Sequence, residues 1–300
     1  MKIISLQPSV SVILDRVGCL DMLAACTKYC LDAVPALRDR DSLEDFGAIA
    51  IESGSTSSGS GHAKQLPRRP IAIVHDSWST RSEDLLPVQA DLVIASIPYR
   101  NESLAAILKS GHPVLALAPH TLTDVFADIR HIAHIINAGP KGDALVAEMQ
   151  AAIKAIHTQA KGIASRPLVY CEEWGKPLIH SQAWVADLIE IAGGTFLGTP
   201  GATTTAEAIA DANPDIIIAA WCGAGNRVPL EKIIVQRGWQ HLTAVRQGRV
   251  YCIADELLNT PAPTLTQGLE ALASAIHPDV FGAPHAPSVR RMDQIHVSNV

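Results

Sequence analysis

Two short stretches, ADLVIAS at residues 90–96 and PDIIIAA at residues 214–220, decide the fold. Each is a continuous apolar run entered through an aspartate, a pattern typical of a parallel strand that is buried on both faces. Each is followed by a polar loop, an amphipathic stretch and a glycine that leads into another apolar run, at 111–117 and at 248–253. The repeated strand–helix–strand order predicts two α/β lobes of similar design.

The composition of the chain supports this plan and excludes several classes of protein. A length of 300 residues, 48% of them hydrophobic, suits two domains of about 100–200 residues, each with its own core. The net charge of −6 and the lack of a long basic stripe argue against nucleic acid as a partner. No apolar run approaches the roughly 18 residues of a membrane span, so we expect no membrane insertion. The six cysteines contain no CxxC pair, and no metal site is predicted.

The longest helical signal lies between the two lobes. Residues 121–137 predict one helix, Gly139-Pro140 breaks it, and residues 143–161 predict an uninterrupted second helix. A long helix between lobes acts as a stiff strut, unlike a flexible linker. The tail is polar and contains proline, so we expect part of it to be disordered. The predicted parts are an N-terminal α/β lobe at 1–140, a linking backbone helix at 141–164, a C-terminal α/β lobe at 165–280 and a tail at 281–300.

The first 26 residues, MKIISLQPSVSVILDRVGCLDMLAAC, look like a lipoprotein export signal. An export signal needs an apolar core of about 7–15 residues, but Gln7 and Pro8 interrupt it and Asp15 and Arg16 bring charge into it. The stretch therefore predicts a strand followed by a helix of a folded lobe. As written the chain is predicted to be cytoplasmic, and periplasmic or at the cell surface if its start was trimmed.

The loops at the carboxyl ends of the predicted strands are the expected ligand site, because ligands bind there in open α/β sheets. Three of the five tryptophans, and a tyrosine, fall in these loops, although aromatic residues make up only 4% of the chain. Large aromatic side chains at loop tips indicate a flat apolar ligand surface, which we expect in a cleft between the two lobes. The alternative is that each tryptophan packs beneath its own loop.

Catalytic patterns are weak by comparison. Glu172 and Glu173 are neighbours in an extended segment, so their side chains should point to opposite faces and not form an acid–base pair. No Gly-x-Ser-x-Gly elbow is present. His75 is a candidate for polar contact with a ligand, and Cys30 and Cys222 are either reactive thiols or small buried apolar residues.

Several motifs resemble those of a known family. The most specific is Glu173-Trp174 followed, after nine residues, by WVADLIEIAGG at 184–194. Residues 3–9, IISLQPS, resemble the family's first strand and turn. Further motifs follow in the family's order: Cys222-Gly223, Gly238-Trp239, GRVY at 248–251 and Asn259-x-Pro261-x-Pro263. Together they resemble the helical-backbone (class III) substrate-binding proteins, and within them the vitamin B12-binding group, across residues 2–278.

The resemblance implies two Rossmann-like lobes joined by a rigid helix. It also implies a ligand between them, usually a corrinoid, haem or iron–siderophore chelate, and an ABC transporter permease as partner. It implies no intrinsic cofactor. Two positions depart from the family: Lys28 replaces a loop histidine, and Gln182-Ala183 replaces Gly-His before the second tryptophan. The resemblance therefore leaves the identity of the ligand open.

The leading hypothesis is a non-enzymatic binding protein for a large chelate, most favourably cobalamin or another corrinoid. One alternative is an exported iron–siderophore or haem substrate-binding protein of an ABC importer. The other is a cytoplasmic enzyme that processes a corrinoid or a metal, using Glu173, His75 or Cys30. The residues predicted to contact the ligand are Trp78, Tyr99, Trp174, Trp184 and Trp221 through apolar area, and Arg100, Glu173, His180, Arg227 and Asn259 through polar groups.

Overall fold

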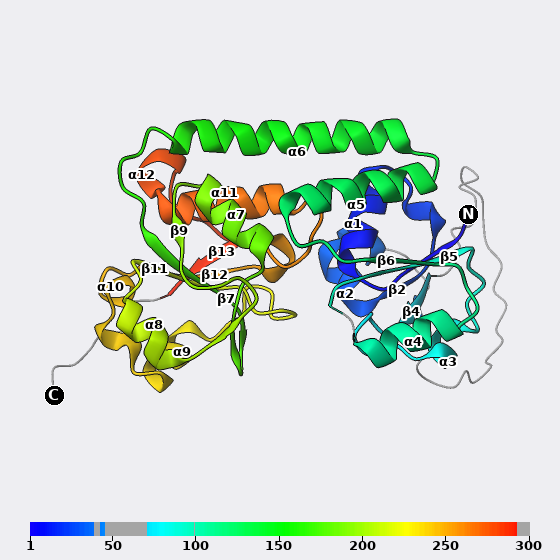
Figure 1. Ribbon diagram of the computed structural model, residues 1–300, viewed down its shortest axis with the longest axis horizontal. Coiled ribbons are helices and arrows are strands. Elements are labelled where there is room, and N and C mark those ends of the chain that lie inside the picture. The colour runs from blue at the N-terminus through cyan, green and yellow to red at the C-terminus, as the bar shows by residue number, and fades with distance from the viewer. Residues whose placement is uncertain (39–42, 46–70, 99, 293–300) are drawn as a thin grey trace, which may run out of the picture. The chain divides into compact units, whose positions relative to one another are not determined.

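The computed structural model describes residues 1–38, 43–45, 71–98 and 100–292, and the chain divides into two compact units. Unit 1 comprises Met1–Pro119 and His131–Gly142, and unit 2 comprises His120–Arg130 and Asp143–Val300 (Figure 1). Each unit has one β-sheet with helices packed on it, which confirms the predicted α/β class with two lobes. The predicted domain boundaries and the predicted cleft stay predictions.

The sheet of unit 1 is parallel throughout, with the strand order β3-β4-β2-β1-β5-β6. Its strands are β1 (Ile3–Ser5), β2 (Leu23–Thr27), β3 (Leu43–Asp45), β4 (Ile71–Val74), β5 (Leu92–Ser96) and β6 (Val114–Leu117). Its helices include α1 (Pro8–Arg16), α2 (Lys28–Ala33), α3 (Ser82–Leu85) and α4 (Asn101–Lys109), with short 3₁₀ turns at Leu20–Met22 and Pro35–Leu37.

Successive side chains along the strands of unit 1 point to opposite faces of the sheet, and helices cover both faces. Ile4, Val93 and Ala95 point to one face, where they pack against Leu85 and against Ile107 of α4. Helix α1 lies on the other face (Figure 1). Burial on both faces explains why the strands read as continuous apolar runs. The first 26 residues thus form β1 and α1, as their sequence predicts, and most of β2, which the sequence analysis did not predict.

The sheet of unit 2 is mixed, with the order β10-β8-β7-β11-β12-β13, and β9 also pairs with β7. Strands β7, β9, β11 and β12 are parallel to their neighbours in this group, whereas β8, β10 and β13 are antiparallel to theirs. The strands are β7 (Leu168–Gly175), β8 (Leu178–His180), β9 (Thr195–Phe196), β10 (Thr203–Thr204), β11 (Ile216–Ala219), β12 (Val250–Ile253) and β13 (Val289–Arg291). The helices and 3₁₀ turns are α7 (Ala183–Ile191), α8 (Ala206–Ala212), α9 (Leu230–Gln236), η3 (Trp239–His241), α10 (Thr243–Arg246), η4 (Asp255–Leu257), α11 (Leu265–Ile276) and α12 (Pro278–Phe281).

Helices cover both faces of this second sheet. Figure 1 shows α7 and α11 on one face and α8, α9 and α10 on the other. The second of these faces holds a core of Tyr170, Ile217 and Val250 packed against Ile233 and Trp239. The sheet is therefore buried in its centre and open to solvent only at its edges and strand ends.

The two quoted repeats form corresponding strands, β5 in unit 1 and β11 in unit 2. The aspartate that precedes each one makes the same contact. A carboxylate oxygen of Asp91 accepts from the backbone N–H of Lys2 at 2.6 Å, and one of Asp215 accepts from that of Leu168 at 2.8 Å. In each unit the aspartate therefore holds the start of the unit's first strand, β1 or β7, against the strand that follows the aspartate, β5 or β11.

Two helices follow β6 in the chain, α5 (Leu122–Ile135) and α6 (Gly139–Ala160). Helix α6 has 22 residues and is about 33 Å long at 1.5 Å per residue. It begins four residues earlier than predicted, because the break falls at Asn137, whose φ of 59° is left-handed, and not at Gly139-Pro140. Pro140 lies in the first turn of α6, where its missing N–H costs no hydrogen bond.

Part of the tail is ordered in unit 2. Residues 289–291 form strand β13, which pairs antiparallel with β12, and Val289 and Met292 are buried. The sheet edge and the buried side chains supply the contacts that order this part of the tail, and the expectation of partial disorder stays a prediction. Among the residues with described coordinates, none of the helices combines the length and the apolar character that a bilayer crossing requires.

Candidate functional site

The carboxyl ends of three parallel strands of unit 2 carry a connected polar cluster. Glu173 lies at the end of β7, Cys222 follows β11 and Asn259 follows β12. The thiol of Cys222 donates to the Glu173 carboxylate at 3.5 Å, and the amide of Asn259 donates to the Cys222 sulfur at 3.4 Å. Gln182 donates to the other oxygen of Glu173 at 2.5 Å. We call these four residues the edge cluster.

The pKa values of two groups in the edge cluster are raised. Burial raises the pKa of the Glu173 carboxyl, although the hydrogen bonds from Gln182 and Cys222 lower it in part. Burial also raises the pKa of Cys222, and the neighbouring charges of Glu173 and Asp255 raise it further. Cys222 therefore stays a thiol that can donate. The cluster offers amide, carboxyl and thiol groups to a ligand.

Asn259 has one more group to offer. Its amide N–H also donates to the backbone oxygen of Ala220 at 2.6 Å, which fixes the side chain. Its carbonyl oxygen is buried and accepts no hydrogen bond from the described part of the chain. A buried acceptor without a donor is unfavourable, so this oxygen gains from any donor that reaches it.

Trp174 follows Glu173 directly in the chain and is an exposed aromatic side chain. It lies near the end of β7, in the hairpin that leads to β8, and it is 44% exposed. Its indole N–H donates to the backbone oxygen of Lys176 at 2.9 Å, so the polar edge of the ring is already satisfied. The exposed ring surface is then apolar, as expected for a residue that stacks on a flat ligand.

Trp221 lies beneath this surface and is half-buried. Its indole N–H donates to the carboxylate of Glu172 at 2.7 Å. The loop that follows it is fixed by Asp255, whose two carboxylate oxygens accept from the backbone N–H groups of Gly223 at 2.7 Å and Gly225 at 2.6 Å. Arg227, at the end of this loop, is exposed, and its guanidinium makes no hydrogen bond or ion pair with any described residue.

Two further residues of the predicted site lie inside unit 2. His180 is 4% exposed, and its ring meets that of Tyr170 edge-on at 5.4 Å. Trp184 is 3% exposed, and its indole N–H donates to the backbone oxygen of Leu258 at 2.8 Å. A ligand on the surface would touch neither side chain as they lie here, so both support the loops from within.

Two of the predicted residues, Trp78 and Arg100, contact each other in unit 1. Trp78 follows β4 and is 43% exposed, and the guanidinium of Arg100 lies 4.5 Å from the centre of its ring. The hydroxyl of Ser103 donates to the backbone oxygen of Trp78 at 2.7 Å. The pair therefore presents a stacked indole and cation at the carboxyl ends of β4 and β5. Tyr99 lies outside the described residues.

The groups proposed for catalysis belong to both units. Cys30 has no exposed surface and contacts the hydroxyl of Thr27 at 3.3 Å. His75 is exposed and lies 3.0 Å from the carboxylate of Asp84. Glu173 belongs to unit 2 and the other two to unit 1. Within the described ranges, no three His, Cys, Asp or Glu side chains gather into a group that could hold a metal ion.

The sequence analysis predicted that Glu173, Trp174, Trp221 and Asn259 lie at the carboxyl ends of parallel strands. In the structure they lie at the carboxyl ends of β7, β11 and β12. It missed the contributions of Gln182, Glu172 and Asp255. Gln182 is the N-cap residue of α7, so its position in front of the helix was a usable signal. Nothing in the sequence pairs Glu172 with two of its partners, Trp221 and Arg237, which lie 49 and 65 residues further along the chain.

Comparisons with known proteins agree with this architecture. A sequence model described as periplasmic binding protein matches residues 3–257. An ABC transporter substrate-binding lipoprotein of Bacillus subtilis (strain 168), YvrC, described as uncharacterized, is 26% identical over 211 residues, which are 66% of this chain and 66% of that protein's length.

Two solved structures share the fold. A periplasmic heme-binding protein from Pseudomonas aeruginosa superposes with a TM-score of 0.75 at 17% identity, over 97% of this chain and 98% of the other. The periplasmic vitamin B12-binding protein BtuF of Vibrio cholerae superposes with a TM-score of 0.66 at 19% identity, over 92% of this chain and 96% of the other. Identities this low show likeness of fold alone.

Proposed function

Because the chain belongs to the periplasmic binding protein family, we propose that it binds a large metal chelate, first of all a corrinoid such as cobalamin, as cargo for an ABC transporter. Proteins of this family are substrate-binding subunits of such transporters and are generally non-enzymatic. The ligand is then carried and released unchanged. The solved relatives that bind vitamin B12 or haem support a ligand of this size and shape.

The observation that carries the proposal is the exposed ring of Trp174, which follows Glu173 of the edge cluster directly in β7. An indole face matches the flat surface of a macrocycle, and a tryptophan can bury about 150–250 Å² when it is covered. The neighbouring amide, carboxyl and thiol groups are close enough to one another to fix the orientation of substituents on the ring. A rigid apolar face with a few polar groups beside it is typical of small-molecule sites.

The chemistry of the edge cluster favours a corrinoid over haem. The rim of cobalamin carries uncharged carboxamides, which pair well with Gln182, Asn259 and a carboxyl whose pKa is raised. Haem carries two carboxylates, which are best matched by arginine. Haem remains the second candidate. The exposed guanidinium of Arg227 has no partner among the described residues, so it could donate hydrogen bonds to one of the haem carboxylates.

A titration of the purified protein tests the proposal. Cyanocobalamin, hemin and a ferric siderophore are added in turn, and tryptophan quenching and visible absorbance are followed. We expect saturable binding of cyanocobalamin with a dissociation constant near or below about 1 μM, equivalent to about 8 kcal/mol. Trp174→Ala should weaken it, whereas Val280→Ala, at a 49% exposed apolar residue of α12, should not. Lack of saturable binding with all three compounds would contradict the proposal.

The proposed place of work follows from the family. A binding subunit that feeds an importer meets its ligand outside the cytoplasmic membrane, and the similar lipoprotein of Bacillus subtilis is described as such a subunit. Fractionation of cells that express the native gene would locate the protein. Recovery in the cytoplasm alone would contradict delivery to an importer and would favour storage of the ligand inside the cell.

The enzymatic alternative has less support. Of the three groups proposed for it, Cys30 cannot meet a substrate because it is completely buried, and His75 lies against Asp84. Incubation of the protein with cyanocobalamin, followed by mass spectrometry of the ligand, distinguishes carriage from conversion. Recovery of an altered corrinoid would favour the enzyme.

A further inference from the structure

The buried carboxylate of Glu172 collects four hydrogen bonds from three parts of unit 2. The phenol of Tyr170 donates at 2.6 Å and the indole N–H of Trp221 at 2.7 Å. The guanidinium of Arg237 donates to both oxygens, at 2.7 and 3.0 Å. Glu172 is 1% exposed, so these bonds replace all of its contact with water.

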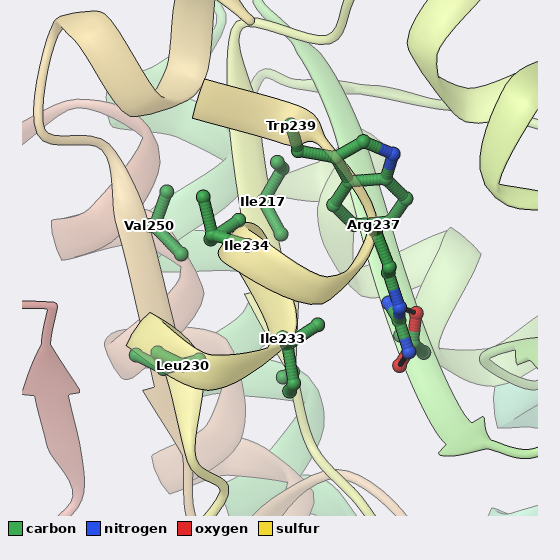
Figure 2. Close-up of a pocket in the computed structure, with 9 residues that line it drawn as sticks. Ile217, Leu230, Ile233, Ile234, Arg237, Trp239 and Val250 are labelled. Atoms are coloured by element: carbon green, nitrogen blue, oxygen red, sulfur yellow. Dashed lines mark hydrogen bonds and ion pairs between the residues drawn. The ribbon is translucent and has the colours of Figure 1, made fainter. Parts of the chain in front are cut away.

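Arg237 approaches Glu172 from the end of α9 through apolar surroundings. Its guanidinium lies 4.8 Å from the centre of the Trp239 ring. Figure 2 shows it extending past Trp239 and beside Ile233, away from Ile217 and Val250, in a small cavity lined mainly by apolar side chains. A charge in such surroundings is costly without its partner, so the two residues depend on each other.

The guanidinium of Arg237 also contacts the chain on both sides of the exposed Trp174. Besides Glu172 it reaches the backbone oxygen of Gly175 at 3.5 Å, so it contacts the chain before and after Glu173-Trp174. The ring of Trp221, which Glu172 holds, lies against the backbone of Gly175. The hydrogen bonds of Arg237 therefore end on Glu172 and Gly175, on either side of Trp174, and Glu172 also holds Trp221.

We propose that Glu172 and Arg237 are positioning residues that hold Trp174 and Trp221 in the orientation that binds the ligand, an inference that rests on the proposed function. A buried ion pair is weak support for stability, because apolar side chains of the same size often stabilise a core equally well. What apolar side chains cannot supply is the directed acceptor for the indole of Trp221 and the donor for Gly175. The pair thus fixes the ligand face before the ligand arrives, which lowers the entropy lost on binding.

The test measures affinity and stability together in Glu172→Gln. Cyanocobalamin is the probe, tryptophan quenching gives its dissociation constant, and thermal unfolding gives the stability. We expect binding about tenfold weaker, because hydrogen bonds to a buried charge are lost. Trp174→Ala should then cost less in the Glu172→Gln protein than in the wild type, since the face is already misplaced. Glu190→Gln is the matched control, because Glu190 pairs with Arg166 at an exposed position of the same unit.

A spectroscopic measurement separates positioning from stability. The indole N–H signal of Trp221, identified as the one that disappears in Trp221→Phe, should shift in Glu172→Gln. Trp221→Phe itself keeps an aromatic ring of similar shape and removes the N–H donor, so it also tests the proposal if Glu172→Gln does not fold. We expect Trp221→Phe to fold cooperatively and to bind cyanocobalamin more weakly than the wild type.

Three results would overturn the proposal, and they differ in what else they overturn. If wild-type protein binds none of cyanocobalamin, hemin or ferric siderophore, both the proposed function and this inference fail. If it binds and folded Glu172→Gln keeps the wild-type affinity while its unfolding temperature falls, the ion pair is merely structural and only this inference fails. Wild-type affinity in Trp221→Phe has the same meaning when Glu172→Gln does not fold.

Discussion

The indole ring of Trp221 lies so close to the backbone of Gly175 that a Cβ atom added there would come within 2.3 Å of ring atom Cζ2. Real Cβ atoms do not approach ring carbons this closely, so either the ring or the strand would move. Glycine lets the end of β7 lie directly on the ring. The two residues join the end of β7 to the loop after β11, and this contact supports the proposed ligand face.

Gly175→Ala should therefore weaken ligand binding. The added methyl group displaces the Trp221 ring from beneath the hairpin, and we expect the affinity for cyanocobalamin to fall by about tenfold, the effect of roughly 1.4 kcal/mol. A fluorescence titration measures it. Gly162→Ala is the control, because a Cβ there meets its nearest atom at 3.8 Å. Equal affinity in both variants would show that the contact does not matter for binding.

Arg100→Ala should uncover Trp78 in unit 1. The guanidinium now shields one face of the ring, and an exposed cation–π contact contributes only about 0.5–1 kcal/mol. We expect a small change in unfolding free energy and faster quenching of tryptophan fluorescence by acrylamide. The same comparison in a Trp78→Phe background should show no change in quenching. A change that persists there would come from another tryptophan.

Gly268→Ala should destabilise the protein, although alanine is the better helix former. In the interior of a helix the substitution ordinarily gains about 1 kcal/mol. At Gly268 of α11, however, the new Cβ would lie 2.1 Å from the backbone oxygen of Leu257, so α11 must move away from η4. Overpacking of this kind costs about 1–3 kcal/mol. Urea unfolding decides the sign, and Ser274→Ala on the same helix is the control for helix propensity.

His180 should make the fold sensitive to acid. Burial lowers its pKa below the ordinary 6.5, although the charge of Glu172 opposes this. As the pH falls, the unfolded state takes up the proton before the folded state does, so stability present above about pH 6.5 is lost below it. We expect the drop in unfolding free energy between pH 7.5 and pH 5 to be smaller in His180→Phe than in wild type.

The control for this pH effect is His131→Gln, at an exposed histidine of α5. It replaces an exposed histidine, so it removes one imidazole from the chain and leaves the buried one at His180 in place. If His180→Phe and wild type lose the same free energy, the acid sensitivity of the protein arises elsewhere.

The sequence predicts much of the fold because burial leaves a direct pattern in it. Strands β5 and β11 are readable as apolar runs since both of their faces are covered. The start of α6 was misplaced because Gly139-Pro140 can either end a helix or begin one, and the left-handed backbone of Asn137 decides between the two. Strand β13 was missed because a short edge strand of mixed polarity has no pattern of its own.

Sequence rules predicted which strand ends carry the candidate residues but not how their side chains are buried or paired. The rule that ligands bind at the carboxyl ends of strands correctly selects Trp174 and Asn259 as neighbours of one edge. It cannot tell whether a tryptophan lies above a loop or below it, so Trp184 was expected at the surface and is buried. Nor does it reveal long-range pairs such as Glu172 with Arg237, because nothing local in the chain couples them.

Strand β13 also affects how the protein can be shortened. Backbone bonds to β12, together with the bond from Arg291 to the backbone oxygen of Gly248 at 2.6 Å, close that border of the unit 2 sheet. A chain cut before Val289 would expose the unpaired amides and carbonyls of β12, which is a template for aggregation. A purification tag or a fusion partner is therefore best attached beyond Met292, where it leaves the closing strand intact.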